Sequence, residues 1–434
     1  MGVTGLARSG KTTLLTSLAA NLLAAGAGLP ALPALLRRLD GRAFRVAIAP
    51  AGADEMPRFA YAAKLAALGA DPPRWPEPTE AVSLLALDLE IGRGGLAATL
   101  PPQRIRLELL DYPGEWLLDI PMLGSDFAAW SAATLARLDH PITAQFRAFV
   151  AGLPARAPAD EGLARTGHDL FVAALRRLRD EAGLPMLQPG RFLMPPPGET
   201  PPWMIFFPLR GDSSLAELMR RRFDKYRDHV REELVSPSFG AVEQLVVLAD
   251  VLGALHAGAV PFAETRSALG AVAAALRWRQ PSLLPAMLQD WLGWLLPFAA
   301  GIRRVAFVAT KSDHVAERQR GNLRSLVRGL ADVPDAAVAE AFAVAAVRCT
   351  EDIVWTLDGR PVSAVRGRLL GDERPARSYP GEVPDRLPDA AFWEHAFLAL
   401  PTFEPMRLVL GGRGGVPHIG LDALAAFLLE DVLP

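Results

Sequence analysis

The segment GLARSGKT, residues 5–12, constrains the fold more than any other part of the sequence. It fits the pattern G-x-x-x-x-G-K-[ST], in which backbone amides cradle phosphate oxygens, at Gly5, Gly10, Lys11 and Thr12. Such a loop follows a strand and precedes a helix. Leucines at helical spacing over residues 14–23 predict the helix, while residues 1–4 leave room for only a short strand. The sequence therefore predicts a strand, loop and helix of an α/β fold.

Composition excludes several classes of protein. The chain has 434 residues, 50% of them hydrophobic, which is enough for two or three packed units. A formal net charge of −2 gives no general attraction to nucleic acid, so we expect no nucleic-acid partner. The single cysteine, Cys349, excludes an internal disulfide and suits a reducing compartment. We expect a cytoplasmic protein in which Cys349 is a small buried side chain rather than a nucleophile.

An apolar stretch over residues 14–36 could be mistaken for a membrane span. It contains Asn21, Pro30 and Pro33, and its polar positions are spaced as on a helix that faces a core. We therefore predict no transmembrane segment.

The remaining elements follow from hydrophobic patterns and turn residues. Residues 30–80 are rich in proline, glycine and charge, so we expect an extended loop there rather than an element. Residues 115–236 are mainly helical in pattern. Strands are predicted at 83–91, 104–110, 244–249, 305–309 and 341–347, and a hairpin at 353–365.

This order of elements predicts a P-loop nucleoside triphosphatase domain of the G-domain type, with a mostly parallel sheet and flanking helices. Its core would comprise residues 1–114 and 237–350. A large helical insertion would occupy 115–236, and a C-terminal extension with the hairpin and a final helix would occupy 351–434.

Two further motifs follow predicted strands in the chain order of a G domain. In Asp111-Tyr112-Pro113-Gly114, Asp111 can hold the water shell of Mg²⁺ and the Gly114 amide can meet a γ-phosphate. In Thr310-Lys311-Ser312-Asp313, the Asp313 carboxylate can accept paired hydrogen bonds from guanine that adenine cannot donate. The alternative is that Ser312 or Asp313 caps the following helix. The order of the three motifs favours a guanine nucleotide.

Several other residues could act at the site, and some of them could equally be ordinary loop, surface or capping residues. Thr79 lies where a switch threonine would complete Mg²⁺ coordination, or it is an ordinary loop residue. Glu115 stands where other GTPases carry a glutamine that orients water, so we expect slow hydrolysis. Arg8 could stabilise charge in cis or simply be exposed, and Arg348 could line the guanine pocket. Asp250 ends a strand and could approach the site, although such an aspartate more often caps a helix or forms a turn, so we do not assign it to the site.

Seven blocks of the sequence match a known family. They are VTGLARSGKT at 3–12, WPEPT at 75–79, LDYPGEWLLDIPML at 110–123, PGRF at 189–192, ATKSDHV at 309–315, YPGEVP at 379–384 and PHI at 417–419. Through these blocks the chain resembles, nearly end to end, the YcjX-like family of bacterial P-loop GTPases, which are described as stress proteins.

The resemblance implies a domain that binds GTP and GDP, with a large helical insertion. It also implies an inner-membrane protein of the YcjF type as a partner, and with it a peripheral position at the inner membrane. Family members usually carry a longer segment ahead of the phosphate-binding loop. We therefore expect the short first strand of this chain to lower stability and to weaken nucleotide binding.

The sequence thus predicts a GTPase that hydrolyses GTP slowly with Mg²⁺ and acts as a regulatory or stress-related switch. We assign chemistry to Lys11, Thr79 and Glu115, and the metal to Thr12, Thr79 and Asp111. The expected nucleotide contacts are Gly5, Arg8, Ser9, Gly10, Lys11, Thr12, Thr13, Gly114, Thr310, Lys311, Asp313 and Arg348. A nonhydrolytic interaction module, a P-loop kinase and an ATPase remain as alternatives.

Overall fold

The structure is a computed structural model. It describes residues 1–6, 9–50, 56–77, 82–95, 99–184, 187–195, 198–234, 242–276, 302–333, 338–372, 374–394, 400–408 and 415–433. The chain divides into two compact units. The first comprises Met1–Tyr112, Glu243–Phe262 and Ile302–Pro434, and the second comprises Pro113–Val242 and Ala263–Gly301.

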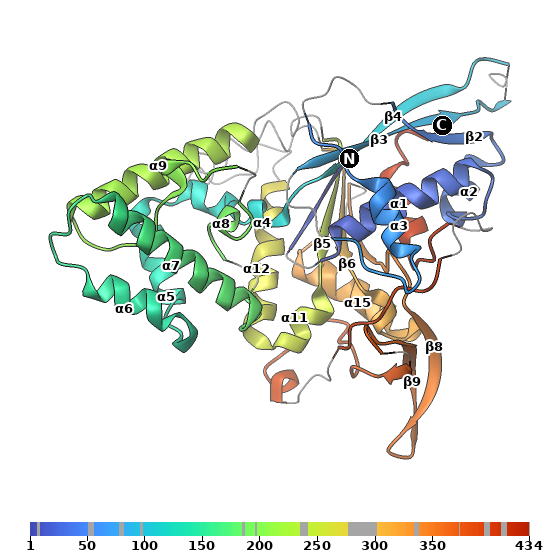
Figure 1. The fold of residues 1–434 in the computed structure, drawn as a ribbon. Coiled ribbons are helices and arrows are strands. Elements are labelled where there is room, and N and C mark those ends of the chain that lie inside the picture. The colour runs from blue at the N-terminus through green and yellow to red at the C-terminus, as the bar shows by residue number, and fades with distance from the viewer. Residues whose placement is uncertain are drawn as a thin grey trace. The chain divides into compact units, whose positions relative to one another are not determined.

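A seven-stranded sheet in the order β2-β3-β4-β1-β5-β6-β7 forms the centre of the first unit (Figure 1). Its strands are β1 (Gly2–Gly5), β2 (Phe44–Ile48), β3 (Ser83–Ile91), β4 (Gln103–Asp111), β5 (Gln244–Ala249), β6 (Arg304–Ala309) and β7 (Ala339–Ala343). The strands from β4 to β7 run parallel, while β3 is antiparallel to both β2 and β4. The predicted α/β class with a mostly parallel sheet is confirmed.

The first strand is short but lies at the centre of this sheet. All four residues of β1 are buried, and they pair with β5 on one side and, through Gly2 and Val3, with β4 on the other. The chain then passes very close to β5, because a Cβ added to Gly5 would lie 2.5 Å from the carbonyl oxygen of Leu248. Only glycine fits at this position, which leads directly into the phosphate-binding motif.

Helices pack on both faces of the sheet. They are α1 (Lys11–Gly26), α2 (Pro33–Leu39), α3 (Tyr61–Leu68), α11 (Val251–Ala257), α15 (Glu317–Leu330) and α16 (Leu421–Leu428), with α12 (Ala259–Leu276) continuing into the second unit. One large core joins α1, α2, α3 and α16 to alternate strand residues such as Val246 and Leu248. The other face of β6 and β7 is covered by α15. Burial on both faces explains why β5 and β6 are apolar after their first residue.

The expectation of an extended loop over residues 30–80 is wrong for part of that range. It contains α2, β2 and α3. Tertiary contacts make these elements: β2 pairs antiparallel with β3, and α2 packs against α16 through buried Leu35 and Leu39. Residues 71–77 do lack helix and strand, as expected.

A smaller antiparallel sheet follows β7, made of β8 (Thr350–Leu357), β9 (Arg360–Arg368) and β10 (Pro375–Ser378). The turn between β8 and β9 is Asp358-Gly359, with φ values of 49° and 77°. Positive φ at both central residues is typical of a tight hairpin turn. The predicted hairpin is therefore confirmed, and the ribbon shows it extending away from the large sheet (Figure 1). The final helix, α16, is also present.

The second unit is built mainly from helices. Its helices are α4 (Gly114–Leu117), α5 (Phe127–Arg137), α6 (Ala144–Gly152), α7 (Glu161–Asp180), α8 (Gly190–Leu193) and α9 (Ser214–Leu234). An aromatic core joins α5, α6, α7, α8 and α9, and Trp130 lies within it with a ring-centroid distance of 5.0 Å to Phe223. The Asp160 carboxylate accepts from the Leu163 amide at 2.8 Å and so caps α7.

Short 3-10 helices complete both units. They are Ile120–Gly124, Pro141–Thr143, Pro202–Met204, Ser312–His314 (η8) and Ala391–Glu394. Across the part of the chain that the structure describes, no helix combines the length and the apolar character needed to cross a membrane.

A buried polar network anchors the segment that follows the D-x-x-G motif. Within the second unit, the Asp119 carboxylate accepts from the Gly190 amide at 2.6 Å and from the Tyr226 hydroxyl. The Arg191 guanidinium lies 3.8 Å from the same carboxylate and 4.7 Å from the centre of the Trp116 ring. The blocks at 110–123 and 189–192 thus meet in the interior of the helical unit.

Candidate functional site

The phosphate-binding motif forms the expected turn into α1. Gly10 is the N-cap residue of α1 and has a left-handed backbone, with φ of 83°. Because Gly10 has no side chain, the first amides of α1 stay uncovered, and such amides are where anions bind. The Lys11 ammonium donates to the Gly5 carbonyl oxygen at 3.1 Å, so it lies over the loop. Ser9 and Thr12 are buried beside it.

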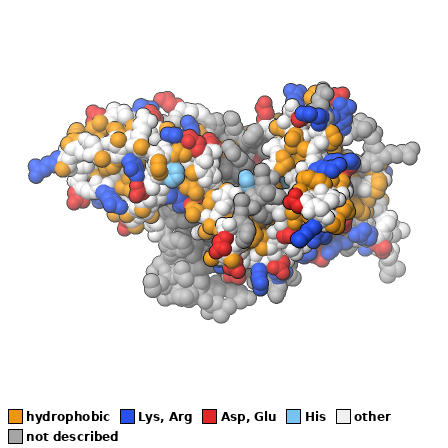
Figure 2. Space-filling model, turned by 90° about the horizontal axis from the view of Figure 1, so that it is seen from below, with side chains coloured by type: hydrophobic (Ala, Val, Ile, Leu, Met, Phe, Trp, Pro, Cys, Tyr) orange, Lys and Arg blue, Asp and Glu red, His pale blue; other side chains and the backbone are white. Residues whose placement is uncertain are grey.

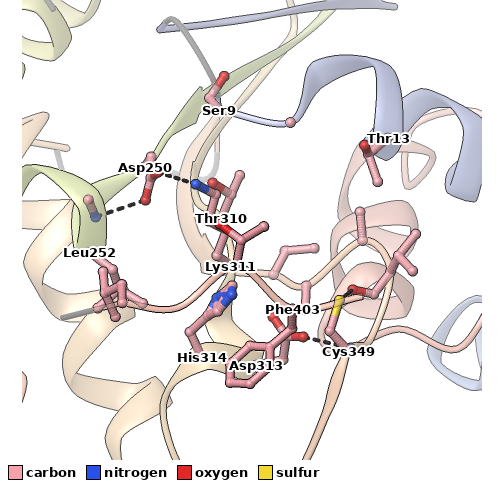
Figure 3. Close-up of a pocket in the computed structure, with 18 of the residues that line it drawn as sticks. Ser9, Thr13, Asp250, Leu252, Thr310, Lys311, Asp313, His314, Cys349 and Phe403 are labelled. Carbon is pink, nitrogen blue, oxygen red and sulfur yellow. Dashed lines mark hydrogen bonds and ion pairs between the residues drawn. The ribbon is translucent and has the colours of Figure 1, made fainter. Parts of the chain in front are cut away.

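The loop opens into a cavity of about 570 Å³ in the first unit (Figure 3). The cavity is bounded by the start of α1, the end of β5, the segments after β6 and β7, and residues 400–403. The predicted residues that line it are Ser9, Gly10, Thr13, Thr310, Lys311 and Asp313. The structure therefore brings the first and third sequence motifs together around one space.

The carboxylate of Asp313 is held in place by backbone contacts. Its Oδ2 atom accepts from the Cys349 amide at 2.7 Å, and its own carbonyl oxygen accepts from the Thr350 hydroxyl. Asp313 lies within η8 and does not cap the next helix, because the N-cap residue of α15 is Ala316. The first amide of α15 instead donates to Asp352. The capping alternative for Asp313 is therefore wrong.

Lys311 and Asp250 form an ion pair at the side of the cavity (Figure 3). Lys311 has a left-handed backbone, with φ of 58°. The other carboxylate oxygen of Asp250 accepts from the Gly253 amide at 2.9 Å and caps α11. Asp250 thus fixes the direction of the Lys311 side chain as well as starting a helix. The only sequence signal for this role was its place at the end of a strand.

Two titratable side chains that line the cavity, half-buried His314 and buried Cys349, have pKa values shifted toward their uncharged forms. Burial lowers the pKa of His314, although the nearby Asp313 and Asp250 carboxylates oppose that effect. Burial also raises the pKa of the Cys349 thiol well above its usual value, and the Asp313 carboxylate adds to the increase. A neutral thiol agrees with the expectation that Cys349 is a small buried side chain.

Several predicted residues lie elsewhere or are not described. Asp111 is buried at the end of β4, next to β1. Gly114 and Glu115 begin α4, in the second unit. The Arg348 guanidinium donates to the Thr350 carbonyl oxygen at 2.8 Å, and its neighbours Val347 and Cys349 line the cavity instead. Arg8 and Thr79 lie outside the described residues.

The oxygen atoms of Thr12 and Asp111 suit Mg²⁺ that is also bound by phosphates and waters, rather than a metal ion whose ligands all come from the protein. Among the residues that the structure describes, no cluster of three or more His, Cys, Asp or Glu side chains could hold an ion. Mg²⁺ at a nucleotide site needs only one or two protein oxygens, since phosphates and waters supply the rest. A threonine hydroxyl at the start of α1 and a carboxylate at the end of β4 are ligands of that kind.

The surface shows no dominant charge on the face seen in Figure 2. Basic and acidic side chains are interspersed there among the described residues. This mixture accords with the small net charge of the chain. Partner recognition on that face would therefore depend on local features.

Comparison with known proteins gives full-length matches. A model of the YcjX-like family, DUF463, matches residues 1–433. The chain is 34% identical over 461 residues to a protein of Escherichia coli (strain K12) named Ras-like GTPase YcjX, covering all of this chain and 95% of that protein. It is 29% identical over 467 residues to a protein of the same name from Shewanella oneidensis (strain MR-1), covering all of this chain and 94% of that protein.

Proposed function

We propose that this chain, which belongs to the YcjX-like family, binds guanine nucleotides and hydrolyses GTP. Two relatives carry the name Ras-like GTPase, which supports this proposal. The observation that carries it is the single cavity shared by the start of α1 and the Asp313 carboxylate. One end of that cavity suits phosphate and the other suits a base with two adjacent N–H donors.

At the phosphate end, the N-terminus of α1 and Lys11 provide positive charge. Lys11 would exchange its contact with the Gly5 carbonyl oxygen for the β- and γ-phosphate oxygens. Ser9, Gly10 and Thr13 would surround the phosphates, since they line the cavity beside Lys11. Thr12 and Asp111, with Thr79, would hold Mg²⁺, which neutralises charge on the phosphates when it is bound.

At the base end, Asp313 would accept hydrogen bonds from the ring N–H and the exocyclic amine of guanine. The contact from the Cys349 amide at 2.7 Å holds the carboxylate ready for this role. A prepositioned acceptor binds more tightly because less freedom is lost on binding. Adenine has no ring N–H beside its exocyclic amine and cannot donate this pair, so we propose selectivity for guanine.

Hydrolysis would be slow without a further factor. Glu115 follows Gly114 where a glutamine orients water in other GTPases. A carboxylate can orient water, but its charge repels the γ-phosphate. We therefore propose a low basal rate and a regulatory, stress-related role, with the YcjF-type inner-membrane protein as partner. Single-turnover release of phosphate from GTP would distinguish this from a nonhydrolytic module.

The direct test is the replacement Asp313→Asn. An amide donates where the carboxylate accepts, so the variant should prefer xanthine nucleotides and lose about 100-fold or more in affinity for GDP. Fluorescent GDP and xanthosine diphosphate would be titrated with Mg²⁺. Asp358→Asn is a matched control, because this exposed aspartate lies in the hairpin turn. Unchanged GDP binding by Asp313→Asn would contradict the base-reading role.

A further inference from the structure

One wall of the cavity comes from a part of the chain far from all three motifs. Residues 400–403, which we call the C-terminal wall, line the cavity together with Asp313 and His314 (Figure 3). Phe403 is buried, whereas Leu400 and Pro401 are half-buried. These residues add an apolar surface beside the proposed base-reading carboxylate.

The C-terminal wall is fixed to the rest of the first unit. The Phe403 ring stacks on the His314 ring, with a centroid distance of 5.3 Å and an interplanar angle of 23°. Phe403 also packs with Cys349 and Val365 in a small separate core. The Thr402 carbonyl oxygen of the wall accepts from the Leu370 amide at 2.9 Å, and the next residue, Glu404, donates its amide to the Arg368 carbonyl oxygen at the end of β9 at 2.8 Å. The wall is therefore a built part of the cavity.

Trp75 connects this wall to the segment that leads toward Thr79. Its indole N–H donates to the Phe403 carbonyl oxygen at 3.0 Å, and its half-buried ring lines the same cavity. A second link joins the two segments, because Arg407 forms an ion pair with Asp71 at 2.7 Å. Trp75 thus has its polar atom bound to the wall and part of its ring facing the cavity.

We propose that Trp75 and the C-terminal wall form an apolar clamp on the base and ribose of the bound nucleotide. The inference rests on the proposed guanine-nucleotide site and deepens it. Asp313 can contact only the edge of a base, whereas the base faces need apolar or aromatic partners. Trp75 and Phe403 bring aromatic rings to the lining of this cavity, beside smaller apolar residues such as Val347 and Cys349. The C-terminal extension is then part of the nucleotide site.

If the clamp holds the base, changing it should lower the affinity for GDP but not the affinity for a ligand that has only phosphate groups. Trp75→Ala should weaken GDP binding about tenfold, because an aromatic contact with the base is lost. Binding of pyrophosphate, which has no base, should stay the same. Trp75→Phe keeps an aromatic ring but removes the N–H donor to Phe403, so its loss should be smaller.

The experiment is a titration of fluorescent GDP, followed by competition with unlabelled GDP and with pyrophosphate. Trp393→Phe is the matched control, because Trp393 packs on Phe262 and Phe392 and does not line the cavity. Energy transfer from tryptophan to the fluorescent GDP should fall in Trp75→Phe but not in the control. Melting temperatures verify folding, and Leu400→Ala offers a milder change in the wall if Trp75→Ala unfolds.

Each outcome has one meaning. No GDP binding by the wild type would overturn the proposed function itself. Wild-type binding together with normal GDP affinity in Trp75→Ala, or in Leu400→Ala if it replaces that variant, would overturn only the clamp. An equal loss of GDP and pyrophosphate affinity would also overturn it, because the effect would then not involve the base. A selective loss of GDP affinity would support the clamp.

Discussion

At the scale of single residues, the proposed base end of the cavity is lined by a histidine with a lowered pKa. The half-buried His314 ring stacks on Phe403, and its partial burial lowers its pKa below the ordinary value. Three charged groups face it: Asp313 and Asp250 favour protonation, and Lys311 opposes it. The folded protein therefore takes up a proton at His314 less readily than the unfolded chain, whose histidines titrate near about 6.5.

The sign of the pH dependence follows from that difference. The contribution of neutral His314 to the free energy of unfolding is complete above about pH 6.5 and is lost as pH falls toward the lower folded pKa. We expect urea unfolding to show lower stability at pH 5.5 than at pH 7.5, and His314→Gln to reduce this difference. The exposed His229 gives the control His229→Gln. An identical pH dependence in wild type and His314→Gln would contradict the assignment.

At the scale of elements, the helical unit depends on the buried network around Asp119. Burial raises the pKa of Asp119, while Arg191 and the hydrogen bonds from Tyr226 and Gly190 oppose the increase. Replacing Arg191 with Met would leave the carboxylate buried without its cation. We expect a loss of about 3–5 kcal/mol in the free energy of unfolding. Tyr226→Phe removes one hydrogen bond and should cost about 1–3 kcal/mol.

Urea unfolding of these two variants would be compared with Arg176→Met, since Arg176 is an exposed residue of α7. That control should change stability by less than about 0.5 kcal/mol. A loss in Arg191→Met no larger than in the control would show that the network does not hold the segment after the D-x-x-G motif.

Elements whose pattern is local could be predicted from the sequence. The strands β3 to β6, α1 and the β8–β9 hairpin have clear periodicity or a clear turn, and they were found. In contrast, β2 is an edge strand of five residues that exists because it pairs with β3. Similarly, α2 begins at Pro33 and is stabilised through α16, almost 400 residues away in the chain. Such elements leave little local signal.

At the scale of the whole molecule, the same contrast applies to the candidate site. The loop and Asp313 could be placed together because parallel strands carry functional loops at their carboxyl ends. Residues 400–403 have no motif, and only tertiary packing brings them beside Cys349 and His314. Trp75 belongs to the block at 75–79, but only the fold brings its indole N–H to the Phe403 carbonyl oxygen. The sequence thus predicts the motifs of the site but not all of its walls.

The division into two units makes a further prediction about ligand binding. A nucleotide that binds only the folded protein raises the free energy of unfolding by about 2.7 kcal/mol at 100 times its dissociation constant. Because the proposed contacts gather around a cavity in the first unit, GDP with Mg²⁺ should slow amide hydrogen exchange mainly there. We expect the largest protection in the phosphate-binding loop, the start of α1 and η8, and little change in α5 and α7.

Hydrogen exchange followed by mass spectrometry would test this unit by unit. Lys11→Ala should abolish the protection, because the proposed phosphate contact is lost, while Lys225→Ala, an exposed lysine of α9, should leave it unchanged. Equal protection of α7 and α1 would mean that the nucleotide stabilises the second, helical unit as strongly as the first unit, which contains the cavity. In that case the insertion would be part of the nucleotide switch, because nucleotide binding would stabilise helices outside the unit that contains the cavity.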